Sequence, residues 1–138
     1  MWDDNNIYVG FRLEEEQDYS PSGEVLERDH MRSPSHSATI QFASAVMTPR
    51  EIVVDINGNY NDMIFEEPWD KWNAEGIEIT NHVEGNVWSV MITIPMKSFA
   101  IEPFVKELNA RIMLNGKYTL NMAYGDPVGW PVFNFTDN

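Results

Sequence analysis

The chain has 138 residues, of which 43% are hydrophobic, enough apolar surface for one folded domain with a buried core. Asp and Glu number 22 against 9 Lys and Arg, and the net charge of −13 disfavours nucleic acid and anionic membranes as partners. The chain has no Cys, which excludes disulfides, thiol catalysis and thiolate zinc sites, and it has no apolar run of the about 18 residues that could be inserted in a membrane.

The first half of the chain alternates between strand patterns and loops. Apolar residues at every second position predict a half-buried strand over residues 7–13, after the turn residues Asp-Asp-Asn-Asn. Two further alternating runs follow, and the second ends at Asn-Gly, a strong turn signal. We expect two long loops, one before the first of these two runs and one after the second. The two runs cover residues 37–43 and 50–57; the loops cover residues 14–36, with a short strand near 24–27, and residues 61–76.

The second half of the chain contains two predicted hairpins. The clearer one has Glu84-Gly85-Asn86 at its turn, and the other has Asn115-Gly116. Between them, residues 98–109 are expected to contain a short helix or helical turn. The hairpin strands are residues 76–83 with 87–94, and residues 111–114 with 118–124.

These elements predict the fold class. Six to eight short strands with turn signals between them, and at most one short helix, are typical of an all-β antiparallel β-sandwich of jelly-roll-like form. The chain shows no internal repeat and no linker. Residues 1–138 are therefore expected to form a single domain.

Five segments in order resemble the family 9 carbohydrate-binding modules, and together they span most of residues 2–126. They are "WDDNNIYVGFRLEEE", "RDHMRSPSHSATIQFA", "REIVVDINGNYND", "VEGNVWSVMITIPMKSF" and "YTLNMAYGD". Modules of this family are β-sandwich domains carried by secreted polysaccharide-degrading enzymes. The resemblance implies a non-catalytic domain that binds plant or microbial polysaccharide or oligosaccharide. It also implies a secreted, periplasmic or cell-surface location.

The resemblance implies a binding site as well. In the family two Trp residues enclose a terminal sugar, and Trp130 in "GDPVGWPVF" looks like one of them. The second is expected before the second strand, where this chain reads "MRSPSHSATI" without Trp, so Trp69 or Trp72 would supply that platform. Asn121 and Asp126 are similar to the family's polar residues. Such sites pair aromatic faces with amides and carboxylates that hydrogen-bond sugar hydroxyls.

Two further expectations come from the resemblance. The family often holds structural Ca²⁺, which the acidic runs Asp3-Asp4 and Glu14-Glu15-Glu16 could bind, although such runs are typical of a solvated surface. Family members also carry an edge strand before the Trp-Asp-Asp turn. We therefore expect an N-terminally truncated domain or part of a larger protein. The edge beside Ile7–Leu13 should then be covered by a dimer contact or a partner chain.

Other functions remain open. No motif selects a catalytic pair among the 22 acids, so an enzyme is not expected beyond an accessory module of a glycoside hydrolase. An assembly domain with a degenerate sugar site is the main alternative. A haem b-binding sandwich, with Met31 or Met47 near the loops as ligand, is the third. Trp88 is expected in the core, Trp2 in a structural role, and His82 at the surface.

Overall fold

The computed structural model describes residues 1–31, 35–44, 47–64, 72–99, 107–115, 120–122 and 132–134. Within these ranges it contains nine β-strands and one short 3-10 helix, Met96–Phe99. The strands are β1 (Asn6–Glu14), β2 (Ser37–Ser44), β3 (Met47–Asp55), β4 (Tyr60–Ile64), β5 (Glu78–Glu84), β6 (Val87–Pro95), β7 (Glu107–Asn115), β8 (Leu120–Met122) and β9 (Val132–Asn134).

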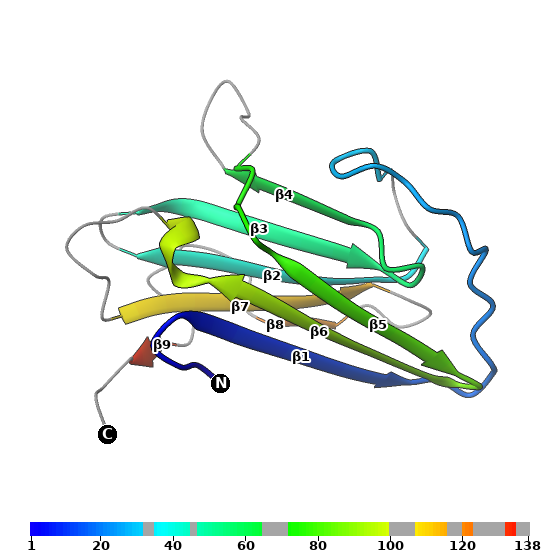
Figure 1. The fold of residues 1–138 in the computed structure, drawn as a ribbon. Helices are drawn as coiled ribbons and strands as arrows, with labels where there is room; N and C mark the ends of the chain where they lie inside the picture. Colours follow the sequence, from blue (N-terminus) through cyan, green and yellow to red (C-terminus); the bar gives the residue numbers. More distant parts are fainter. Residues whose placement is uncertain are drawn as a thin grey trace.

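The strands form two antiparallel sheets. The small sheet has the order β1-β6-β5, and the large sheet has the order β4-β3-β2-β7-β8, with β9 also paired to β7. Figure 1 shows the small sheet lying in front of the large one, so the two make the layers of a sandwich. The expected all-β sandwich is confirmed.

The core lies between the two layers, because every second residue of each strand points inward. Trp88 is fully buried there, and its Nε1 donates a hydrogen bond of 2.6 Å to Oδ1 of Asn81. The predicted core position of Trp88 is confirmed. The other buried apolar residues from β1, β2, β3 and β6 are Ile7, Phe11, Ala38, Ile40, Phe42, Ile52, Val54, Val90, Ile92 and Ile94.

The prediction of a loop beginning at residue 61 was wrong, because β4 covers residues 60–64. Asn and Asp are rare in strands, so the segment "YNDMI" carries no strong strand signal. Tertiary contacts decide its structure. The carboxylate of Asp55 accepts hydrogen bonds from the backbone N–H groups of Asn57 (2.9 Å) and Asn59 (2.8 Å), which closes the turn and pairs β4 with β3.

Two smaller expectations had different outcomes. No strand forms at residues 24–27, because that backbone bonds to asparagine side chains rather than to another strand. A 3-10 turn at Met96–Phe99 overlaps the start of residues 98–109, where a short helix or helical turn is expected, whereas residues 107–109 begin β7 and pair with β9. Residues 100–106 lie outside the described ranges.

Candidate functional site

A polar groove of about 510 Å³ lies where β1 ends, β2 begins and β3 ends. In Figure 1 this is the right-hand end of the sandwich, where the chain rises from β1 toward the start of β4. We call it the Tyr19 groove. It is lined by Glu15, Gln17, Asp18, Tyr19, Ser20, Ser22, Ser35, His36, Ile56 and Asn57.

Residues 15–31 form the long loop that supplies most of the groove, and its first part is tied to the β5–β6 turn. The backbone N–H of Glu15 donates to the carbonyl of Asn86 at 3.0 Å, and Nδ2 of Asn86 donates to the carbonyl of Glu15 at 2.7 Å. Four residues later, the N–H of Tyr19 donates to the carbonyl of Gly85 at 2.9 Å. The Tyr19 side chain is thereby held above the open end of the small sheet.

Three alternate asparagines of the β3–β4 hairpin hold the rest of the loop. Oδ1 of Asn57 accepts from the N–H of Gly23 at 3.0 Å. Asn59 accepts from the N–H of Leu26 at 2.8 Å and donates to the carbonyl of Glu24 at 2.9 Å. Asn61 exchanges two bonds with the backbone of Met31, at 3.1 and 3.0 Å. We call Asn57, Asn59 and Asn61 the asparagine ladder, because it replaces the backbone pairing that a neighbouring strand would provide.

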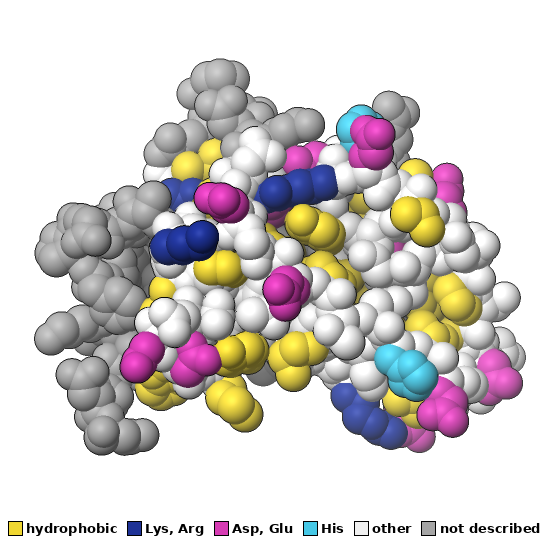
Figure 2. All heavy atoms as spheres, viewed as in Figure 1, with side chains coloured by type: hydrophobic (Ala, Val, Ile, Leu, Met, Phe, Trp, Pro, Cys, Tyr) yellow, Lys and Arg dark blue, Asp and Glu magenta, His cyan; other side chains and the backbone are white. Residues whose placement is uncertain are grey.

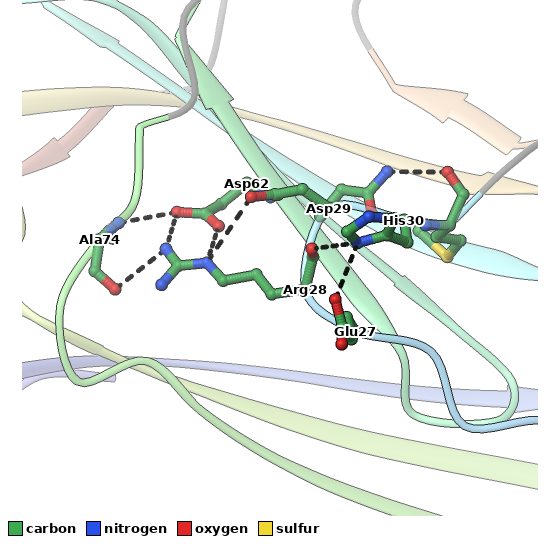
Figure 3. A network of polar contacts seen from close by, with 8 residues as sticks. Glu27, Arg28, Asp29, His30, Asp62 and Ala74 are labelled. Carbon is green, nitrogen blue, oxygen red and sulfur yellow. Dashed lines mark hydrogen bonds and ion pairs between the residues drawn. The ribbon is translucent and has the colours of Figure 1, made fainter.

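A partly buried ion pair anchors the end of the loop to β4 (Figure 3). Nε of Arg28 donates to Oδ1 of Asp62 at 2.6 Å, and Nη2 donates to Oδ2. Asp62 is only 1% exposed and also accepts from the N–H of Ala74 at 2.8 Å. This carboxylate raises the pKa of Arg28 above its ordinary value. Arg28 therefore joins the loop to β4 and to the segment before β5 through a charge-assisted fork.

Tyr19 and His36 make the aromatic wall of the groove. Their rings meet edge to face with centroids 5.3 Å apart, and Tyr19 also meets Trp88 at 6.4 Å. The Tyr19 hydroxyl is buried and has no hydrogen-bond partner among the residues that the structure describes. Burial, together with the charge of Glu15, raises the pKa of Tyr19 above its ordinary value. A buried hydroxyl without a hydrogen bond lowers the stability of the fold unless a ligand or a water molecule bonds to it.

The composition of the groove defines the ligands that it could accept. Ile56 is a buried apolar residue, and the other lining residues offer hydroxyls, amides and two carboxylates. Among the lining residues that the structure describes there is no Lys or Arg. Its volume is in the usual range for small-ligand sites, and its donors and acceptors suit a polyhydroxylated molecule without negative charge.

Two of the site residues suggested by the sequence, Asn121 and Trp72, lie in the described ranges. Asn121 is in β8, opposite Met113 of β7. Trp69, Asp126 and Trp130 lie outside the described residues, so their roles stay predictions.

Trp72 is described and half-buried. Its Nε1 donates to the carbonyl of Ser98 at 2.8 Å, and the guanidinium of Arg50 lies over its ring at 5.1 Å from the centroid. It packs against the core cluster. A sugar stacking on the Arg50 side of this ring would have to displace the guanidinium, and ligand contact at Trp72 stays a prediction.

Sequence reasoning missed the Tyr19 groove. Residues 14–36 carry no periodicity, and Tyr19 stands between Asp18 and Ser20 in an ordinary loop composition. The nearest signal is the alternation of asparagines in "INGNYND", which is unusual for a strand and points to side chains that serve a neighbouring backbone.

His30 and His36 do not meet. His30 lies 3.9 Å from Glu27, and His36 lies 3.6 Å from Glu15. The described part of the chain has no group of three or more His, Asp or Glu residues that could hold a metal ion. Calcium binding stays a prediction.

The chain was compared with family models, with curated proteins and with solved structures, and none of them matches it. In the described ranges no helix is long and apolar enough to cross a bilayer.

Proposed function

We propose that this chain is a non-catalytic carbohydrate-binding domain, and that the Tyr19 groove contributes to its site. The ligand would be a polysaccharide or oligosaccharide that is neutral or carries amino groups. The observation that carries the proposal is the buried hydroxyl of Tyr19, which has no partner among the described residues and belongs to the wall of a groove lined by hydroxyl, amide and carboxylate groups. The ordered resemblance of residues 2–126 to the family 9 modules supports the same function.

The negative charge of the groove and of the whole chain limits the class of ligand that the groove would bind. Glu15 and Asp18 line the groove, none of the described lining residues is Lys or Arg, and the chain carries a net charge of −13. Uronate and sulfate groups would be repelled at this site. Xylan, cellulose, mannan and neutral glucans are therefore expected to bind better than pectin.

The test is a binding titration against these glycans, followed by Trp fluorescence and calorimetry with and without Ca²⁺. Tyr19→Phe removes only the hydroxyl and should weaken binding by about tenfold, the value of one hydrogen bond. Tyr8→Phe is the matched control, because Tyr8 lies on β1 and its hydroxyl bonds to Asp3 rather than lining the groove. Its affinity should equal that of the unmodified chain.

Two results would overturn parts of this proposal separately. Equal affinity of Tyr19→Phe and Tyr8→Phe, with loss of binding in Trp130→Ala, would move the site to Trp130 and keep the function. The absence of binding to every glycan in both calcium conditions would reject the carbohydrate-binding function itself.

A further inference from the structure

A second site, independent of the proposed sugar site, lies at the free edge of β1. β1 is the last strand of the small sheet and pairs only with β6 on its other side. The first two residues of the chain pair with this edge. The N–H of Tyr8 donates to the carbonyl of Met1 at 2.8 Å, the Met1 ammonium donates to the carbonyl of Tyr8 at 3.2 Å, and Trp2 forms an antiparallel bridge with Ile7.

Beyond Tyr8 no described strand pairs with this edge. Backbone groups in an antiparallel strand face alternate sides, so those of Gly10 and Arg12 point the same way as those of Tyr8, away from β6. On that side they make no hydrogen bond to any described residue. Unpaired groups in a row are a template for another strand, and Met1 already shows the antiparallel geometry that this edge accepts.

An apolar cavity of about 200 Å³ lies beside the open edge. β1 lines one side of it, and β2 and β7 line the other through Ile40, Phe42, Ala110 and Ile112. Figure 2 shows hydrophobic side chains gathered at the lower left of this face, near the N-terminus and the start of β1 as drawn in Figure 1. A strand added to β1 would point the residue opposite Val9 into the space between the sheets, because facing residues share a side.

We propose that the free edge of β1 binds an extended, basic segment of a partner protein, which adds antiparallel to β1 and places one apolar side chain in this cavity. Charge favours this occupant. Residues 1–16 contain Asp3, Asp4 and Glu14-Glu15-Glu16 but only Arg12 as a basic side chain. Lys or Arg on the outward positions of the added strand would complement them. A second copy of this chain would bring its own charge of −13 to the edge and would be repelled.

The probe is a short peptide with blocked ends that alternates Lys with Val, and the comparison peptide has Glu in place of each Lys. The full chain is titrated by calorimetry, and amide exchange is measured at Gly10 and Arg12. The Lys peptide should bind and slow exchange at both amides, and binding should weaken with salt. Failure of the Lys peptide to bind, or equal binding of the Glu peptide, would overturn the proposal.

Position 10 offers a matched pair of variants. Gly10→Pro removes an N–H that faces away from β6, so the ladder to β6 is kept and only the added strand loses a donor. Its affinity should fall by about tenfold. Gly10→Ala keeps the N–H, and its Cβ meets only the flexible end of Met91 at 3.3 Å, so it should bind as the unmodified chain does. Equal affinities of the two variants would contradict the edge assignment.

A variant on the opposite sheet decides the question if Gly10→Pro fails to fold. Ala110→Leu fills the cavity from β7 and leaves the β1 backbone untouched. Ala110→Leu should also lower the affinity for the Lys peptide by about tenfold, because burial of a Val-sized side chain contributes about that factor to affinity. Unchanged affinity of Ala110→Leu for the Lys peptide would show that the cavity does not hold a side chain of the added strand. Concentration-dependent protection of Gly10 and Arg12 without peptide would instead identify a second copy as the occupant and overturn the proposal.

Discussion

Arg28 stabilises a loop without secondary structure through its ion pair with Asp62. Asp62 is buried to 1% exposure and depends on the Arg28 fork and the Ala74 amide. Removing Arg28 leaves a buried carboxylate without its counter-ion. Arg28→Ala should therefore lower the free energy of unfolding by about 3 kcal/mol, as measured by urea denaturation. Arg28→Lys keeps the charge but not the bidentate geometry and should lose about half as much.

The control is Arg12→Ala. Arg12 makes an ion pair with Glu14 at 3.0 Å in which both side chains are more than half exposed. This change should alter the free energy of unfolding by less than about 0.5 kcal/mol. Similar losses in Arg28→Ala and Arg12→Ala would mean that Asp62 is solvated in solution.

At the scale of elements, the asparagine ladder explains how a long loop is ordered beside an edge strand. Asn59→Ala removes the partner of the Leu26 N–H and of the Glu24 carbonyl at once. The variant should lose about 2 kcal/mol of unfolding free energy and exchange the Leu26 amide faster. Asn5→Ala, at an exposed turn residue, is the control and should change neither quantity. Slow exchange at Leu26 in Asn59→Ala would show that the loop does not need the ladder.

The strands also show which elements the sequence pattern predicts and which it does not. β1, β2, β3, β5 and β6 follow from their alternation, and the β5–β6 turn follows from Gly85-Asn86. β4 does not, because Asn61 and Asp62 form hydrogen bonds to Met31 and Arg28 rather than a pleated apolar face. Periodicity reports which side chains meet the core and not which ones serve a neighbouring loop.

At the scale of the whole molecule, the charge of −13 should make stability depend on salt. Repulsion among surface carboxylates opposes the compact state and is screened by ions, whereas the partly buried Arg28–Asp62 pair is screened much less. Raising NaCl at neutral pH should increase Tm by about 4 °C. Near pH 4.4, the sequence pI, the same salt should have little effect. A fall in Tm with salt at neutral pH would indicate that surface ion pairs outweigh the repulsion.

The sequence by itself determined the all-β class, the core position of Trp88 and the exposure of His82, since alternation and composition are local properties that fix which face is apolar. The suggestion of an uncovered edge at Ile7–Leu13 came from the resemblance. The tertiary structure alone decided that Tyr19 and His36 meet, that Asp62 needs Arg28, and that a cavity lies beside Gly10. These features join residues far apart in the chain through loops, where backbone and side-chain hydrogen bonds rather than periodicity choose the partners.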